Sequence, residues 1–383
     1  FYVSGVFRGP LTFPSIPSNI NLAPNSNIDF DFFVAHYNGT FFDWAKQGTG
    51  AGSNVITDMF VNTTLNGVYV TGYYSGLMTV ESAVTAVGGD DVFALRLDAI
   101  SGSESWLATG GGSSAGRSYG ITQHAGTVHI TGRFRSSASF GGFLLNTGFI
   151  SINNVFIASL NESSGVFTDA FEVNSNDNGS IAFDIATDGT RNYVVGEYNN
   201  TLVATPERWS TSIRDFFVLS TNNSDLSVNA LWGSYYYTLD ISDSDTDDSG
   251  NTYLAGSIRG YYEYLTSSYI TQGDDDVYIA IFDNSGSLLR FEFGGGPGRD
   301  VAEAILVNKV TNEVYLTGTF ETAMSIAGSN FIGGSSSNAF LAKYDITGSI
   351  WGIHAVNSTG LITVNDLATD PAGNVVITGN KGT

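Results

Sequence analysis

The sequence predicts an all-β fold, and we expect a single β-propeller of about six four-stranded blades plus one extra strand. Three observations predict it: four short apolar phrases that recur along the chain, the composition, and the lack of any helical pattern between the recurrences. Of the 383 residues, 14% are charged, 13% are aromatic and 46 are glycine. Long helical surfaces need many Glu, Lys, Arg and Ala residues, so this balance favours strands and turns. Seven blades, one of them incomplete, is the alternative.

The four phrases are clearest between Asp300 and Asn357, where DVAEAILVN, EVYLTGTFE, NAFLAKYD and IWGIHAVN follow one another. Each is an apolar run bounded by Gly, Asn, Asp or Ser, which is typical of strands joined by turns. We call them the first, second, third and fourth strands of a repeat. A lone repeat cannot bury both of its faces, so neighbouring repeats must stack as blades.

The second strand ends in a glycine in every repeat. It occurs seven times, at YVSG 2–5, YVTG 69–72, HITG 129–132, YVVG 193–196, YLAG 253–256, YLTG 315–318 and VITG 376–379. Consecutive glycines lie 60 to 67 residues apart, whereas common propeller repeats have roughly 40–50 residues. We attribute the excess to a long loop after the second strand, such as Tyr73 to Asp90.

The third strand places Asp or Asn two residues before an aromatic residue. The six pairs are Asp31/Phe33, Asp91/Phe93, Asn154/Phe156, Asp215/Phe217, Asp276/Tyr278 and Asn338/Phe340. We expect each Asp or Asn to accept backbone N–H groups and so fix the end of the preceding loop. The fourth strand carries Trp44, Trp106, Trp232 and Trp351 in four of its six occurrences.

Six first, seven second, six third and six fourth strands leave one second strand more than six blades can hold. We divide the domain 1–383 into the propeller proper, an N-terminal strand with a Pro-rich connector at 1–30, and C-terminal ring-closing or exchanged strands at 361–383. An unpaired edge strand is ready to pair with another chain, and a head-to-tail contact builds an open filament. The expected assembly residues are Tyr2, Val3, Val6, Val375, Val376 and Ile377.

Five segments resemble the SBBP-type β-propeller repeats of bacterial and archaeal proteins: VYLTGTF, NAFLAKYD, IWGIHAVN, DWAKQGTG at 43–50 and SWLATGGG at 105–112. The resemblance covers essentially the whole chain. It implies a propeller and a secreted or surface-attached protein, but no particular activity and no catalytic residues. The strand tally departs from that family, which is usually seven-bladed.

The chain is strongly acidic, with 37 acidic and 15 basic residues and a formal net charge of −22. Such a surface repels phosphate backbones and anionic lipids, which argues against nucleic-acid and membrane partners. No apolar run approaches the roughly 20 residues that span a bilayer. The absence of cysteine excludes disulfides, thiolate metal sites and cysteine nucleophiles.

No set of catalytic residues stands out, so we expect no enzyme. The one G-x-S-x-G, at 112–116 around Ser114, falls in a predicted turn rather than before a helix. The histidines, at His36, His124, His129 and His354, never have the spacing of metal ligands.

Acidic residues recur on the first strands. Asp58, Asp184, Asp243 and Asp366 occupy equivalent positions, and the first strand lines the central channel of other propellers. These carboxylates are candidate ligands for a hard cation such as Ca²⁺. The alternative is that they bind neighbouring backbone or are solvated.

Seven N-x-[S/T] sequons make glycosylation a further prediction. They are Asn38, Asn62, Asn161, Asn178, Asn199, Asn222 and Asn357, and all fall in predicted turns or loops.

We therefore expect a non-enzymatic extracellular or cell-surface scaffold whose chains assemble with one another into a filament. The alternative is an adhesin or glycan-binding module that uses exposed aromatics such as Tyr261, Tyr262 and Tyr264. A carbohydrate-active enzyme would need paired carboxylates at hydrolase separations, which a sequence does not define.

Overall fold

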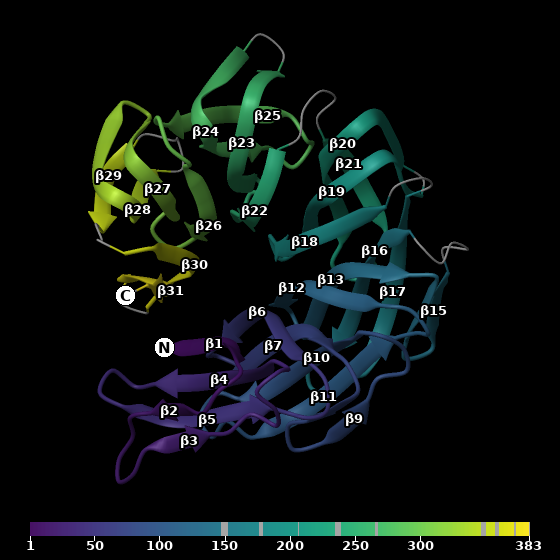
Figure 1. The fold of residues 1–383 in the computed structure, drawn as a ribbon. Coiled ribbons are helices and arrows are strands. Elements are labelled where there is room, and N and C mark those ends of the chain that lie inside the picture. The colour runs from purple at the N-terminus through teal and green to yellow at the C-terminus, as the bar shows by residue number, and fades with distance from the viewer. Residues whose placement is uncertain are drawn as a thin grey trace. The chain divides into compact units, whose positions relative to one another are not determined.

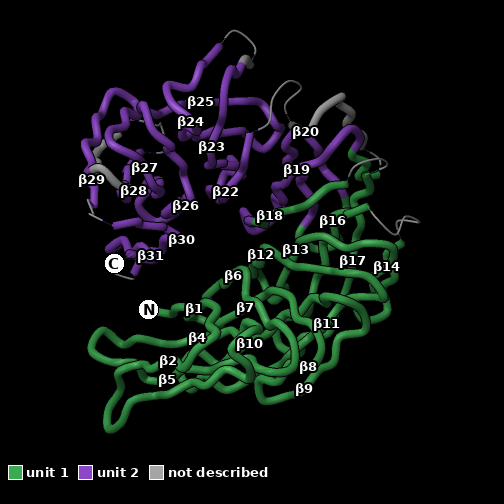
Figure 2. Tube along the Cα trace, in the orientation of Figure 1, with its two compact units in different colours: residues 1–185, 202–206, 223–227 green, residues 186–201, 207–222, 228–383 purple. Residues whose placement is uncertain are grey.

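The computed structural model describes residues 1–146, 152–175, 179–205, 207–233, 239–264, 267–345, 350–356, 360–370 and 373–382. Within these ranges the chain forms 31 strands and no helix (Figure 1), which confirms the all-β prediction. No helix in the described ranges could therefore cross a membrane. The chain divides into two compact units, shown in Figure 2. Unit 1 comprises 1–185, 202–206 and 223–227, and unit 2 comprises 186–201, 207–222 and 228–383.

Unit 1 contains three antiparallel meanders and three small hairpins. Its strands are β1 (Tyr2–Phe7), β2 (Leu11–Phe13), β3 (Ile20–Leu22), β4 (Asp31–Tyr37), β5 (Phe42–Gly48), β6 (Asn54–Asn62), β7 (Gly67–Tyr74), β8 (Leu77–Thr79), β9 (Ala83–Thr85), β10 (Asp91–Asp98), β11 (Glu104–Gly111), β12 (Gly116–His124), β13 (Thr127–Arg135), β14 (Ser137–Phe140), β15 (Phe143–Asn146), β16 (Asn153–Asn161) and β17 (Phe167–Ser175). The meanders are β1-β4-β5, β6-β7-β10-β11 and β12-β13-β16-β17.

Strand β18 (Ser180–Thr187) passes from unit 1 into unit 2. The strands that follow are β19 (Arg191–Ala204), β20 (Glu207–Asn222), β21 (Val228–Gly233), β22 (Leu239–Thr246), β23 (Thr252–Tyr264), β24 (Ser267–Phe282), β25 (Leu288–Gly295), β26 (Val301–Asn308), β27 (Glu313–Ile326), β28 (Ser329–Asp345), β29 (Ile350–Val356), β30 (Ile362–Thr369) and β31 (Val375–Lys381). Unit 2 contains the meanders β19-β20-β21, β22-β23-β24-β25 and β26-β27-β28-β29 and the pair β30-β31.

The four sequence phrases correspond to four strands throughout the described chain. The extra strands are the short hairpin pairs β2-β3, β8-β9 and β14-β15. The second strand β7 and the third strand β10 are buried along nearly their whole length, whereas the terminal second strands β1 and β31 are not. A short continuous apolar run suits such a strand because both of its faces are covered.

The long loops expected after the second strands are β-hairpins, so that part of the prediction is wrong. The segment after β7 forms β8-β9, the segment after β13 forms β14-β15, and β27 and β28 simply extend past their repeat. The Pro-rich connector likewise contains the hairpin β2-β3. These segments also bury large apolar side chains, such as Met78, Phe140 and Phe331, so apolar packing and backbone pairing together stabilise them.

Apart from β2-β3, the hairpins whose register is described join consecutive repeats, because each pairs with the end of the fourth strand that precedes it. The observed pairs are Thr49–Thr79, Gly110–Phe140, Gly111–Ser139, Asn174–Val203, Ser175–Leu202, Gly294–Ile326 and Gly295–Ser325. We call this contact the hairpin clasp.

The glycine of the second strand makes room for a bulge in the first strand. A Cβ on Gly72 would overlap the carbonyl oxygen of Val55, and Gly132, Gly256, Gly318 and Gly379 face first-strand carbonyls in the same way. The register shifts near each contact, for example between Ile56 and Asp58. A β-bulge bends one strand toward its partner, and only a residue without a side chain fits there.

We predict that Gly72→Ala lowers the free energy of unfolding by about 1–3 kcal/mol, the usual cost of forcing extra atoms into packed structure. Gly5→Ala is the matched control, since a Cβ on Gly5 would meet only the Phe33 ring at 3.0 Å. Urea unfolding of both variants measures the difference. Equal losses would show that the first-strand carbonyl does not impose the glycine.

Candidate functional site

Strand β1 occupies the position of a second strand. In the second and third strands whose register is described, the glycine lies opposite the aromatic residue: Gly5–Phe33, Gly72–Phe93, Gly132–Phe156, Gly256–Tyr278 and Gly318–Phe340. β1 thus lies beside β4 as β7 lies beside β10. Among the described residues, however, no first strand pairs with its other edge.

The predicted assembly residues of β1 make contacts within unit 1. Tyr2 is half-buried, stacks on His36 with 4.6 Å between ring centroids, and donates its hydroxyl to the Ala99 carbonyl at 3.1 Å. Val3 is half-buried, and Val6 is 39% exposed. β1 is therefore seated in its position, with one edge open.

Strand β31 is the least covered second strand of the described chain. Val375, Val376 and Ile377 are half-buried and the following four residues are exposed, whereas β7 and β13 are almost wholly buried. Val375 and Ile377 pack in a cluster with Tyr315 and Leu367. β31 pairs only with β30 within the described ranges, so the edge that a third strand would cover is open.

The first-strand carboxylates link consecutive repeats. Asp58 accepts the N–H of Ile121 at 2.7 Å through one oxygen and the N–H of Met59 at 2.7 Å through the other. Asp243 does the same with the N–H of Ile305 at 2.8 Å. These carboxylates lie directly after the bulge, which turns them toward the next first strand. We call this contact the carboxylate clamp.

Of the other two candidate metal ligands, Asp366 lies opposite Thr378 directly after a bulge, as Asp58 lies opposite Thr71. Asp366 accepts the N–H of Leu367 at 2.7 Å, and Asp184 lies on β18, whose backbone approaches Gly120 closely. Nowhere in the described ranges do three or more His, Asp or Glu side chains come close enough to hold a metal ion. Asp58 and Asp243 therefore bind neighbouring backbone N–H groups, which is the alternative that the sequence left open.

The Asp or Asn at the start of the third strand fixes the loop before it, as predicted. Asp91, Asp276 and Asn338 each accept the N–H of the residue four positions earlier, at 2.6, 2.9 and 3.0 Å. Asp31 accepts the N–H of Asn25 in the preceding loop. Asn154 differs, because the N–H that it accepts belongs to Ser175 at the end of β17, after the third strand. The role is structural and recurs from repeat to repeat.

One of these junctions brings two buried carboxyl groups together. Asp276 and Asp300 are both fully buried, and Asp276 Oδ1 and Asp300 Oδ2 have no hydrogen-bond partner in the described structure. The N–H of Asp300 donates to the Asp275 carbonyl at 2.7 Å, as the N–H of Asn54 does to Phe30. At that equivalent junction Asn54 Nδ2 donates to Asp31 Oδ1 at 3.0 Å.

The pKa of Asp300 depends on its burial and on the charged and polar groups around it. Burial raises its pKa to about 7, and the negative charges of Asp276 and Glu321 add to the shift, while backbone N–H groups oppose it. Burial also raises the pKa of Asp276, although its bond from the Tyr269 hydroxyl works against this. Arg299 is the nearby cation, paired with Asp275 at 2.8 Å.

Three fourth-strand tryptophans, Trp44, Trp106 and Trp232, pack against the following repeat. This role was not predicted from the sequence. Their indole rings cover glycines of positive φ in the next turn between third and fourth strands. The pairs are Trp44–Gly102, Trp106–Gly165 and Trp232–Gly286. Trp44 and Trp106 also donate their indole N–H to backbone carbonyls there, at 3.1 and 2.8 Å. The missed signal was a turn Gly about 60 residues after each Trp.

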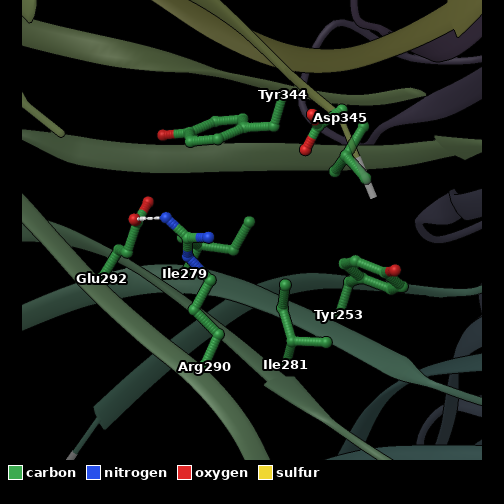
Figure 3. A pocket seen from close by; sticks show the side chains of 8 residues that line it. Tyr253, Ile279, Ile281, Arg290, Glu292, Tyr344 and Asp345 are labelled. Carbon is green, nitrogen blue, oxygen red and sulfur yellow. Dashed lines mark hydrogen bonds and ion pairs between the residues drawn. The ribbon is translucent and has the colours of Figure 1, made fainter. Parts of the chain in front are cut away.

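The hollow shown in Figure 3 lies within unit 2, between β24 and β25 on one side and β27 and β28 on the other. Arg290 and Glu292 form an ion pair on its wall. The Tyr344 hydroxyl is buried without a described partner, and burial raises its pKa. The hollow leaves no space for a water molecule, so it offers no ligand site.

Ser114 and His129, which were considered for catalysis and metal binding, both have structural surroundings. Ser114 stands in the turn between β11 and β12 with no helix after it. His129 is fully buried on β13, between the Ser159 hydroxyl at 2.9 Å and the Asn223 side chain. Burial lowers its pKa to about 4, so it is neutral at physiological pH.

The aromatics expected to be exposed differ among themselves. Tyr261 is 43% exposed, but Tyr262 is 1% exposed and packs against Phe291 at 4.8 Å, so the prediction was wrong for Tyr262. The side chain of Tyr264 lies outside the described part.

The sequons are not all in turns. Asn38 is exposed just after β4, and Asn161 is the exposed last residue of β16, whereas Asn62 and Asn222 are the half-buried last residues of β6 and β20. Asn199 lies inside β19, which contradicts the predicted loop. Asn178 and Asn357 lie outside the described residues.

No family model matches the chain, and no curated protein matches it. Among solved structures, the chain is similar to BamB from Moraxella catarrhalis, known from a crystal structure. The similarity covers 96% of this chain and 95% of that one, with 13% sequence identity and a TM-score of 0.41. A likeness this distant carries no argument about function.

We predict that Asp243→Ala lowers the free energy of unfolding by about 1–3 kcal/mol, because it leaves the N–H of Ile305 without its acceptor. Asp248→Ala is the control, since the Asp248 side chain is 76% exposed. Thermal melts in calcium and in chelator measure the loss. A loss seen only in calcium would instead identify Asp243 as a cation ligand.

The Asp276–Asp300 junction predicts a pH dependence. A carboxyl whose folded pKa is raised from 3.8 to about 7 stabilises the fold fully below pH 4, and this contribution is lost as the pH rises through about 7. Asp300→Asn should remove that loss and raise the Tm at pH 8 by at least about 2 °C. The reverse change, Asn54→Asp, should create a similar loss. Parallel Tm profiles for wild type and Asp300→Asn from pH 5 to 8 would contradict the assignment.

Proposed function

We propose that the chain is a non-enzymatic structural protein of the cell exterior whose molecules assemble head to tail by exchanging a β-strand. The observation that carries the proposal is β31, a second strand with an open edge and an exposed end. By contrast, β7, β13, β23 and β27 each lie between a first and a third strand. An open edge is a template for pairing with another chain.

We also propose that the repeats are blades of one β-propeller. The repeated four-stranded meander, the hairpin clasps and the carboxylate clamps support stacking of successive repeats. The resemblance to SBBP-type repeats supports the same arrangement and a secreted or surface-attached location. The net charge of −22 suits a soluble surface outside the cell, and the exposed Asn38 and Asn161 are the sequons best placed for glycans.

In the proposed exchange, β31 of one molecule takes the position that β1 holds beside β4 of the next. The phrases YVSG and VITG align without a gap, so Gly379 would lie opposite Phe33 and Val376 opposite His36. β31 brings β30 with it, and β30 is the first strand that β1 lacks. The contact joins unlike surfaces, so it propagates into an open filament unless the rotation closes a ring.

The chain has no cysteine. A disulfide between two introduced cysteines therefore reports this contact alone, because no native cysteine can compete. We predict that a Val376→Cys chain mixed with a His36→Cys chain gives disulfide-linked dimers on a non-reducing gel. Opposed residues of antiparallel strands have Cα atoms about 4.5–5.5 Å apart, within the span of a disulfide.

The matched control is the double variant Tyr2→Cys/His36→Cys, which reports β1 in its own position as an intramolecular disulfide. Its yield should fall as assembly proceeds. If the unmodified protein sediments as a monomer at high concentration and the mixture yields no dimer, the proposed function is wrong.

A further inference from the structure

We propose that the hairpin β2-β3 of one molecule clasps the exposed end of β29 in the neighbouring molecule. The inference rests on the proposed head-to-tail assembly and names a second contact of the same interface. It follows from the hairpin clasps between consecutive repeats, because the hairpin β2-β3 and the end of β29 make no such clasp within the described ranges. The end of β21 and the segment after β23 that would match it include residues outside those ranges.

The hairpin side of the clasp has a fixed place in the repeat. The residue seven positions after the second-strand glycine pairs with the preceding fourth strand, as Thr79, Ser139, Val203 and Ser325 do. In the first repeat that residue is Thr12, seven positions after Gly5. Thr12 is exposed on β2, and β2 pairs only with β3 in the described structure.

The hairpin is already folded and anchored. Phe13 is buried and packs with Phe33 at 5.2 Å and with Phe42 at 4.9 Å between ring centroids. The N–H of Phe42 donates to the Pro14 carbonyl at 2.9 Å. The edge is therefore held rigid on unit 1, so little conformational entropy is lost when a strand joins it.

The fourth-strand side is equally defined. The paired residues Thr49 and Gly111 lie five positions after Trp44 and Trp106, and the corresponding residue after Trp351 is Val356. Val356 is 59% exposed, whereas Gly111 is half-buried under its hairpin. Within the described ranges β29 pairs only with β28. A clasp in the common register therefore puts Thr12 opposite Val356.

The segment before each clasp contains a left-handed residue four positions after the second-strand glycine. Gly76, Ser136 and Thr322 have φ values of 70°, 61° and 61°. Gly9 stands at that position in the first repeat but does not have a positive φ. Glycine adopts this conformation without steric cost, so Gly9 is free to form the same bend when the clasp closes.

The occupant is a second copy of this chain, because only a fourth strand with the repeat's own register meets the hairpin in this way. Purified Thr12→Cys and Val356→Cys chains, mixed with oxidised glutathione, should form disulfide-linked heterodimers in yields that rise with concentration. Thr12→Cys mixed with Val310→Cys is the control, since Val310 is a 93% exposed valine in the turn between β26 and β27. We expect several-fold more heterodimer with Val356→Cys.

Four results overturn the clasp. Equal yields with Val310→Cys would mean random collision. A double Thr12→Cys/Val356→Cys chain that closes only on itself would place the contact within one molecule. If the unmodified protein assembles in sedimentation while the mixture gives no heterodimer, the clasp is wrong and the strand exchange stands. If nothing assembles, both proposals fail.

Discussion

The close approach of a first-strand carbonyl to the glycine of the second strand is the constraint on which the repeated structure depends. The bulge that produces it also turns the following residue toward the next repeat, where Asp58 and Asp243 accept backbone N–H groups. A contact inside one repeat is thereby coupled to a contact between repeats. This coupling explains why the glycine recurs while the residues around it vary.

The sequence predicts the strands better than it predicts their contacts. Second and third strands are continuous apolar runs buried by their own repeat, and this is a local signal. The hairpins were read as loops because their partners lie in another repeat, as Ser325 pairs with Gly295. Tyr262 was misplaced because the residue that covers it, Phe291, lies on another strand of the same repeat, 29 residues further along the chain. The first-strand carboxylates were found by register, but their N–H partners lie more than 60 residues away.

The repeats share a backbone but differ where they join. Asn54 and Asp31 form an amide–carboxylate bond, while the equivalent pair Asp300 and Asp276 consists of two buried carboxyl groups. Like charges at short range favour sharing one proton. A shared proton can therefore take the place of the amide hydrogen of Asn54. We expect the Asp276–Asp300 junction to be sensitive to pH and the Asn54–Asp31 junction not to be.

The contacts between repeats all have a direction. A hairpin reaches back to the preceding fourth strand, whereas a carboxylate and a tryptophan reach forward to the following repeat. An array of such repeats therefore presents unlike surfaces where its contacts stop, here the open edge of β31 with the end of β29 and the hairpin β2-β3 with β1. Gly5 shows what is missing, because it keeps the glycine that admits a first strand although no first strand pairs with β1 in the described chain. In the proposed assembly these two unlike surfaces meet, and a contact between unlike surfaces is heterologous.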